Sequence, residues 1–201
     1  MTTRGRTNLP VGLLALQGDF ARHEAAFAAL GVPTCPVRRP AELAGVRGLV
    51  IPGGESTTLS RLVDLVGLRA PLRDFAGERP VLGTCAGLIM LCAELVDEAT
   101  GDHGVRTLGL LDCSVRRNAY GRQVDSFTAP VALPGLGPDA APFPAVFIRA
   151  PRLVRTGPGV EVLATHDGHP VAVRQGRLLG LAFHPELTGD LRLHRAFLDL
   201  A

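Results

Sequence analysis

A cysteine in a glycine-rich turn is the residue of this chain best suited to covalent chemistry. Cys85 lies in Gly83-Thr84-Cys85-Ala86-Gly87, after the apolar run 80–83, which indicates a short buried strand, and before 88–95, which has a helical pattern. A nucleophile on a sharp strand-to-helix turn needs small neighbours, and the N–H groups at a helix start favour a thiolate. The motif predicts a nucleophile elbow built on cysteine. The alternative is a buried structural cysteine, a common fate of a free thiol.

A cysteine nucleophile needs a base, and the base needs a group that orients it. Among the six histidines, His184 has the most informative context, because it follows the apolar run 178–183 and precedes Pro185 and Glu186. Both His184 and Cys85 come at the carboxyl ends of expected strands, where sites form in open α/β sheets. Pro185 restricts the backbone, so Glu186 can accept from one imidazole nitrogen and leave the other for sulfur. The alternative is an incidental histidine in a surface turn.

A second loop could stabilise an oxyanion. The segment 52–58, Pro-Gly-Gly-Glu-Ser-Thr-Thr, follows an expected strand and opens an expected helix. Its paired glycines let main-chain N–H groups approach a ligand, and Ser56 is placed to cap the helix. The loop lacks the lysine of a phosphate-binding P-loop. We therefore expect an oxyanion hole made by the N–H groups of Gly54 and Ala86.

The elements that carry these residues alternate in the first half of the chain. Expected strands are at 11–16, 34–37, 48–51 and 80–83, and expected helices at 21–30, 57–65, 71–75 and 88–95. Strand patterns then dominate, at 111–116, 123–131, 145–148, 160–164, 171–174 and 178–183, with a proline-rich loop at 133–144 and a last helix at 190–200. This order predicts an α/β fold with an open, mostly parallel sheet, helices on both faces, and a β-rich second half. We expect a flexible N-terminal segment at 1–10 and a single domain at 11–201.

The composition excludes several functions. The chain has 201 residues and a formal net charge of +2, too small a charge to indicate binding to nucleic acid or to a membrane surface. The four cysteines lack metal-ligand spacing, and no zinc ligand set is visible, so we predict neither a metal nor another cofactor. Free thiols indicate a reducing compartment, and the polar start of the chain lacks the apolar segment of a secretory signal. We expect a cytoplasmic protein.

These motifs together resemble a known family. Gly83-Thr84-Cys85-Ala86-Gly87 with His184-Pro185-Glu186 is similar to the class I (triad) glutamine amidotransferases. Four further blocks narrow the resemblance to the glutaminase subunits of pyridoxal 5′-phosphate synthase, over about residues 11–200: Leu16-Gln17-Gly18, Pro52–Thr58, Gly121–Phe127 and Phe147–Pro151. The resemblance implies a flavodoxin-like fold and hydrolysis of L-glutamine through a cysteine thioester. It also implies that ammonia passes to a PdxS-type synthase, which is a (β/α)₈ barrel, in a hetero-oligomeric complex.

The resemblance also assigns roles to individual positions. It implies Cys85 as the nucleophile with His184 and Glu186 as its partners. It places the L-glutamine site on Gly54, Glu55, Ser56, Arg117, Ile148 and Arg149. One departure is Ala119-Tyr120, where the family usually has a small polar residue and phenylalanine. Two other functions stay open from the residues: a γ-glutamyl hydrolase or an amidotransferase module of a different synthase, and a non-catalytic α/β protein with Cys85 as a redox sensor. A redox-sensor role for Cys85 would give the His-Pro-Glu motif no function.

Overall fold

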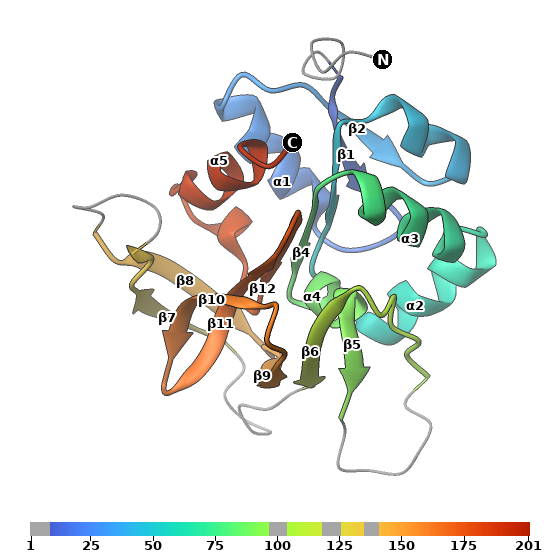
Figure 1. Ribbon diagram of the computed structural model, residues 1–201. Coiled ribbons are helices and arrows are strands. Elements are labelled where there is room, and N and C mark those ends of the chain that lie inside the picture. Colours follow the sequence, from blue (N-terminus) through green and yellow to red (C-terminus); the bar gives the residue numbers. More distant parts are fainter. Residues whose placement is uncertain (1–8, 97–103, 118–125, 135–140) are drawn as a thin grey trace.

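A seven-stranded sheet forms the centre of the fold in the computed structural model, which describes residues 9–96, 104–117, 126–134 and 141–201 (Figure 1). The strand order is β10-β11-β12-β4-β3-β1-β2. The parallel part consists of β1 (Val11–Leu14), β2 (Thr34–Val37), β3 (Gly48–Ile51), β4 (Val81–Thr84) and β12 (Leu178–Leu181). Two antiparallel strands, β10 (Glu161–His166) and β11 (His169–Gln175), extend it at one edge.

Helices cover both faces of this sheet. In Figure 1, α1 (Phe20–Ala29) and α5 (Arg192–Leu198) lie together on one side, and α2 (Ser56–Leu65), α3 (Arg69–Glu78) and α4 (Ala86–Leu91) lie on the other. Phe27 and Phe197 join α1 to α5, with their ring centroids 6.1 Å apart. Every residue of β1, β3, β4 and β12 is buried, as expected of parallel strands covered on both faces. The predicted open, mostly parallel α/β sheet is therefore correct.

The β-rich half of the chain forms two smaller sheets beside the main one. One contains β5 (Cys92–Leu95), β6 (Leu111–Arg116) and β9 (Arg152–Thr156), and the other is the hairpin of β7 (Ser126–Val131) and β8 (Phe143–Ile148). Short 3₁₀ segments, η2 (Pro40–Gly45) and η4 (Pro185–Leu187), complete the described elements. The N–H of His184 donates to the carbonyl of Val146 over 2.8 Å, which ties the β7–β8 hairpin to the end of β12.

One expectation about the elements was wrong, and one strand was missed. The helix expected at 88–95 ends at Leu91, because Cys92 takes up an extended backbone and begins β5, which pairs in parallel with β6. A short apolar run does not by itself distinguish a buried helix from a strand. Strand β9 was not predicted at all. The expected strand start at 123 and the N-terminal segment up to residue 8 lie outside the described residues.

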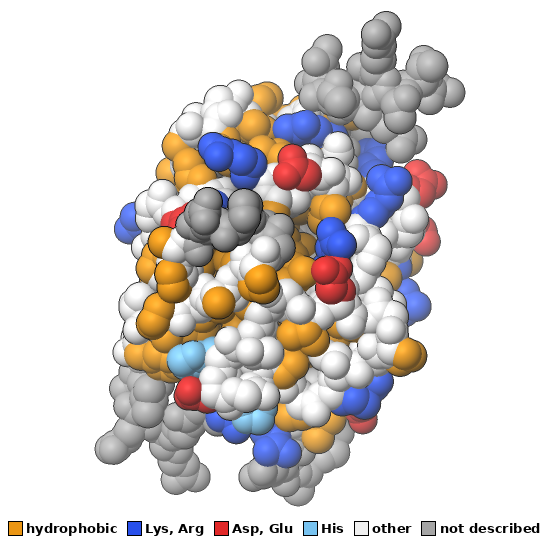
Figure 2. Space-filling model, turned by 60° about the vertical axis from the view of Figure 1, so that its left-hand side comes forward, with side chains coloured by type: hydrophobic (Ala, Val, Ile, Leu, Met, Phe, Trp, Pro, Cys, Tyr) orange, Lys and Arg blue, Asp and Glu red, His pale blue; other side chains and the backbone are white. Residues whose placement is uncertain are grey.

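The surface agrees with the small net charge. On the face shown in Figure 2, basic and acidic side chains are interspersed among apolar and neutral ones. Within the described ranges, no helix is both long enough and apolar enough to cross a bilayer.

Candidate active site

Cys85 occupies a strained turn between β4 and α4. Its φ of 50° and ψ of −104° are unusual for a residue with a side chain, and its N–H donates to the carbonyl of Leu181 over 2.8 Å. The flanking glycines are required by close packing. A Cβ on Gly83 would stand 2.6 Å from the carbonyl oxygen of Gly87, and a Cβ on Gly87 would overlap the carbonyl oxygen of Ile51. This backbone has the geometry of the predicted nucleophile elbow.

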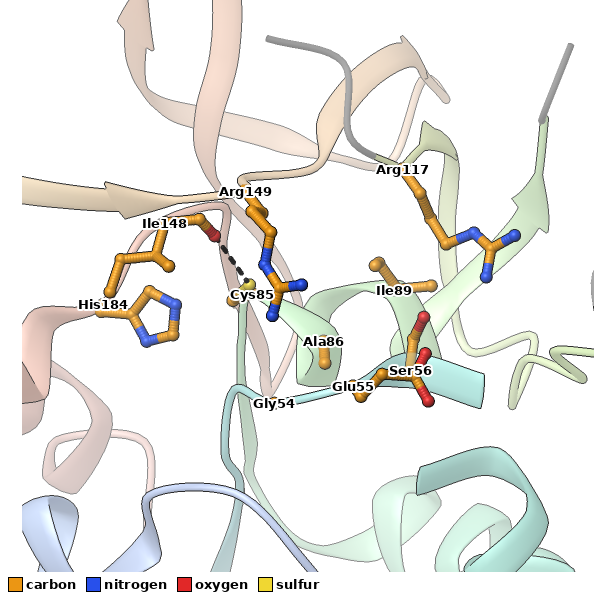
Figure 3. A pocket seen from close by; sticks show the side chains of 10 residues that line it. All are labelled: Gly54, Glu55, Ser56, Cys85, Ala86, Ile89, Arg117, Ile148, Arg149 and His184. Atoms are coloured by element: carbon orange, nitrogen blue, oxygen red, sulfur yellow. Dashed lines mark hydrogen bonds between the residues drawn. The ribbon is translucent and has the colours of Figure 1, made fainter. Parts of the chain in front are cut away.

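His184 and Glu186 come together beside this elbow. Nδ1 of His184 and Oε1 of Glu186 are 2.7 Å apart, and both residues are buried. Sγ of Cys85 lies 3.9 Å from the carbonyl oxygen of Ile148 (Figure 3). A Cβ on Gly53 would overlap Cε1 of His184 and stand 3.3 Å from Cβ of Cys85. The imidazole, the elbow and the glycine loop are therefore in close contact.

The electrostatics of the pair follow from this geometry. Burial lowers the pKa of His184, but its hydrogen bonds with Cys85 and Glu186 outweigh burial and raise the pKa to about 10. Burial raises the pKa of Glu186, but the hydrogen bond from His184 and the charge of His23 outweigh it, so the pKa lies below its usual value. Near neutral pH the pair is an imidazolium and a carboxylate, and the imidazolium faces sulfur.

A pocket of about 180 Å³ opens next to Cys85 (Figure 3). Its lining residues are Gly54, Glu55, Ser56, Cys85, Ala86, Ile89, Arg117, Ile148, Arg149 and His184. Every predicted site residue except Glu186 thus lines one cavity, and Glu186 contacts His184. Sequence reasoning missed Ile89. Its position one helical turn after Cys85 was the available signal, because residues i and i+4 share a helix face.

The loop 52–58, which contains Gly53 and Gly54, is held at the start of α2 by the side chain of Glu55 rather than by that of Ser56. The Glu55 side chain accepts from the N–H groups of Thr57 and Thr58 at 2.8 and 2.6 Å and so caps α2. Burial opposes ionisation of this carboxyl, but the hydrogen bonds from Thr58 and Thr57 lower its pKa to about 2. The expectation that Ser56 is the cap was wrong, since Ser56 is the first residue of the helix. The loop is also held by Gln17, whose Oε1 accepts from the N–H of Glu55 at 3.2 Å.

Two arginines bring positive charge to the pocket from different strands. Arg149 follows β8 with a φ of 42°, and its side chain extends over Cys85 in Figure 3. Arg117 follows β6, and its guanidinium donates to the hydroxyl of Thr57 over 3.2 Å. Guanidinium groups match the geometry of a carboxylate. Residues 118–125, which include Tyr120 and most of the block Gly121–Phe127, lie outside the described residues.

The described part of the chain contains no group of three histidine, cysteine or acidic side chains placed to hold a metal ion. All four cysteines are free. Burial raises the pKa of Cys113 to about 11, with Asp112 raising it further and Arg155 opposing, and burial also raises the pKa of Cys92 well above its ordinary value. Those two thiols are therefore poor nucleophiles.

The class of this fold and site is that of a glutamine amidotransferase. The profile of the SNO glutamine amidotransferase family matches residues 13–200, and the chain belongs to this family. A solved structure described as a glutamine amidotransferase is similar with a TM-score of 0.87 at 47% identity, covering 94% of this chain and 97% of that one. A glutamine amidotransferase structure from Thermotoga maritima, with a TM-score of 0.61 over 96% of this chain and 83% of that one, shares only the fold at 16% identity.

The most specific matches are to proteins of one name. A protein of Salinispora arenicola is 55% identical over 94% of this chain and 95% of its own length, and one of Acidothermus cellulolyticus is 56% identical over 94% and 92%. Both are named pyridoxal 5′-phosphate synthase subunit PdxT. These matches confirm the family resemblance that the motifs predicted.

Proposed function

We propose that this chain is the glutaminase subunit of a pyridoxal 5′-phosphate synthase. It hydrolyses L-glutamine to L-glutamate and ammonia and supplies the ammonia for vitamin B6 synthesis. The observation that carries this proposal is the meeting of the strained Cys85 elbow with the buried His184–Glu186 pair at one pocket of a SNO-family fold.

The first step is attack of the Cys85 sulfur on the carboxamide carbon of glutamine. A C–S bond forms, the carbonyl π electrons move to oxygen, and the N–H groups of Gly54 and Ala86 stabilise this oxyanion. The N–H of Ala86 lies at the start of α4, where helical N–H groups have no partner within the helix. The Gly53 carbonyl oxygen lies against Gly18 on the β1 side. The N–H of Gly54 points away from this oxygen, because N–H and C=O are opposed across a trans peptide.

The second step breaks the C–N bond. His184 delivers its proton to the departing nitrogen, ammonia leaves, and a γ-glutamyl thioester remains on Cys85. His184, now neutral, takes a proton from water as the water attacks the thioester carbon. The C–S bond then breaks and its electron pair returns to Sγ of Cys85, which leaves a thiolate beside the His184 imidazolium. The product carboxyl group loses its proton to solvent and departs as glutamate. Glu186 stabilises the imidazolium through its 2.7 Å contact with Nδ1 and keeps the ring in one orientation.

The pocket suits the α-amino acid end of glutamine. Arg149 and Arg117 supply charge for the α-carboxylate, and the side of the loop at Glu55 and Ser56 supplies acceptors for the α-ammonium. Ile89 and Ile148 provide apolar wall for the methylene groups. The α-carboxylate, the α-ammonium and the methylene groups of glutamine thus each have a complementary group in the pocket.

The recipient of ammonia is a PdxS-type synthase subunit in a hetero-oligomeric complex. The names of the relatives support this, because each is named as one subunit of pyridoxal 5′-phosphate synthase. We place the active unit in a single domain at 11–201, in the cytoplasm, where free thiols are kept reduced. Docking of the synthase adjusts the Gly53-Gly54 peptide, since glycine tolerates a peptide rotation that other residues resist.

The test measures ammonia release from glutamine by the full chain, with and without a purified PdxS-type subunit. We expect the synthase to increase turnover and Cys85→Ala to abolish it, while the variant still binds glutamine by calorimetry. High turnover that is the same with and without the synthase would favour a stand-alone γ-glutamyl hydrolase. Unchanged turnover in Cys85→Ala would overturn the assignment of Cys85 as the nucleophile. If the wild-type chain releases no ammonia even with the synthase present, the proposed glutaminase function is wrong.

A further inference from the structure

Two buried histidines lie directly behind the triad, and the mechanism above does not use them. His23 on α1 and His194 on α5 are both fully buried. Their rings approach closely, with Nδ1 of His23 3.0 Å from Nε2 of His194. On its other side, Nε2 of His23 lies 3.4 Å from Oε2 of Glu186 and 3.4 Å from Oγ1 of Thr84. The two helices therefore place a line of imidazoles against the back of the catalytic carboxylate.

Glu186 needs such a partner. One carboxylate oxygen, Oε1, contacts His184, whereas Oε2 is buried and accepts no hydrogen bond of standard geometry among the described residues. An unsatisfied buried carboxylate oxygen is costly, because it has lost water without gaining a donor. The imidazole of His23 is the group that faces this oxygen from outside the 184–186 turn.

The contacts select one protonation pattern. Burial lowers the pKa of His23, with Glu186 and Asp19 opposing and His184 adding to it, and burial with the charge of His23 lowers the pKa of His194 to about 4. Both rings are therefore neutral near pH 7, and each has one N–H. A proton on Nε2 of His23 faces the carboxylate. Its Nδ1 is then an acceptor and receives the Nε2 proton of His194.

This assignment also accounts for Nδ1 of His194, the ring nitrogen that faces away from His23. Nδ1 of His194 has no hydrogen-bond partner among the described residues, and in this pattern it is a bare lone pair rather than a buried N–H. In the opposite pattern the lone pair of His23 Nε2 could accept from the hydroxyl of Thr84, but it would also face the carboxylate oxygen, and Nδ1 of His194 would be a buried N–H without an acceptor among the described residues. That pattern would also leave Oε2 of Glu186 without a facing donor.

We propose that His23 is a positioning residue of the glutaminase, acting through Glu186, and that His194 holds His23 in the tautomer that faces the carboxylate. The inference rests on the proposed triad. In this arrangement His194 donates to His23, His23 donates to Oε2 of Glu186, and His184 donates to Oε1 of the same carboxylate. His23 does not line the glutamine pocket, so its effect falls on turnover rather than on substrate binding.

The groups that face Glu186 define the expected pH effect. His184 faces it from its own turn, His23 from α1, and His194 acts on it from α5, while Asp19 acts on His23. Loss of the His23 donor makes protonation of Glu186 easier. The acid limb of the pH–rate profile then moves to higher pH.

The experiment compares His23→Leu, His23→Gln and His23→Asn in the complex with the synthase. Glutamine carries an N–H at the reach of Nε2, whereas asparagine carries its amide near the place of Nδ1. We expect His23→Leu to lower kcat about tenfold with KM for glutamine unchanged, as for other groups that orient a functional histidine. His23→Gln recovers part of this loss, His23→Asn does not, and the acid limb moves upward in the leucine and asparagine variants. His194→Leu gives a smaller loss of the same kind.

The matched control is His169→Leu, a histidine-to-leucine change on β11 in the pairing with β10. It should leave kcat and the acid limb unchanged. Circular dichroism and thermal unfolding show whether each variant folds. If His23→Leu fails to fold, the comparison of His23→Gln with His23→Asn tests the positioning role. Equal kcat and equal acid limbs in those two folded variants would overturn the positioning role and leave only packing.

A second measurement separates this inference from the proposed function. Iodoacetamide alkylation of Cys85, followed by mass spectrometry of its peptide across pH, reports the sulfur–imidazole pair without any turnover. We expect His23→Leu and His23→Asn to shift this pH profile and His169→Leu to leave it unchanged. An unshifted profile would overturn the inference, even where ammonia release from the wild-type complex upholds the glutaminase.

Discussion

Nδ1 of His184 lies 2.7 Å from Oε1 of Glu186, although only Pro185 separates the two residues in the chain. The extended backbone of His184, with φ −106° and ψ 90°, and the short 3₁₀ turn after it fold the carboxylate back under the imidazole. The proposed base and its proposed orienting group thus come from one local motif, and the parallel pairing of β12 with β4 places that motif next to the end of β4.

We predict that Glu186→Gln lowers kcat roughly 10²- to 10⁴-fold, because an amide cannot stabilise the imidazolium and allows the wrong tautomer. The KM for glutamine should change little. Steady-state ammonia release in the presence of the synthase measures both constants. Glu161→Gln is the matched control, since Glu161 forms an exposed ion pair with Arg174 on β10 and β11. A variant at position 186 with wild-type kcat would remove glutamate from the triad.

The parts of the site that sequence reasoning predicted are those fixed by short stretches of chain. Cys85 between glycines, the His-Pro-Glu turn and the Gly-Gly loop each carry their geometry locally. The strand order then brings them together, because β3, β4 and β12 are parallel neighbours whose carboxyl ends meet at one edge. The meeting of Cys85, the His-Pro-Glu turn and the Gly-Gly loop, to which we assign the reaction and the oxyanion, could therefore be expected from the residues alone.

The parts that were missed depend on contacts between distant segments. His23 and His194 are 171 positions apart and meet only when α1 packs on α5. Nothing in the local sequence around either residue signals burial beside a carboxylate. Strand β5 was missed for a related reason, since the partner that turns Cys92 out of the helical pattern is β6, further along the chain. Ser56 was expected to cap α2 because serine is a preferred cap, but Glu55 reaches the same N–H groups one residue earlier.

Gly53 is a point where a single methyl group should disrupt the site. A Cβ there would overlap Cε1 of His184 and stand 3.0 Å from its Nδ1, so the ring must move. We predict that Gly53→Ala lowers kcat roughly 10²-fold, the scale expected when a reacting group is displaced by about an ångström. Ammonia release measures the loss, and circular dichroism shows that the fold is kept. Gly45→Ala is the control, because a Cβ at Gly45 meets nothing within 4 Å. Equal kcat values for Gly53→Ala and Gly45→Ala would show that the His184 ring can move without loss of activity.

Arg149 should act on substrate affinity. Its exposed guanidinium extends over Cys85 into the pocket, where the α-carboxylate of glutamine is proposed to bind (Figure 3). A charge-assisted hydrogen bond contributes about 1.5–3 kcal/mol, so Arg149→Gln should raise KM roughly 10- to 100-fold with a much smaller change in kcat. Arg149→Lys should lose less, because it keeps the charge. Arg195→Gln, an exposed change on α5, should leave KM alone. A fall in kcat at constant KM would assign Arg149 to the reaction step instead.

The buried histidines should make the fold sensitive to acid. Burial and the charge of His23 lower the pKa of His194 from 6.5 to about 4, with Glu186 opposing. The unfolded chain therefore binds a proton below about pH 6.5 that the folded chain does not bind until about pH 4. The stability that this histidine contributes in its neutral form is complete above pH 6.5 and is lost progressively as the pH falls towards 4, amounting to about 3 kcal/mol.

We therefore predict that His194→Leu flattens the decline in unfolding free energy between pH 6.5 and 4. Urea unfolding at a series of pH values measures it for wild type and variant. His184 gives the opposite sign, because its pKa is raised to about 10, so its contribution is present below 6.5 and is lost only as the pH rises towards 10. It cannot produce the acid loss. His169→Leu, at the β10–β11 turn, should retain the wild-type slope. An identical acid slope in wild type and His194→Leu would show that His194 accepts a proton in the folded chain without penalty.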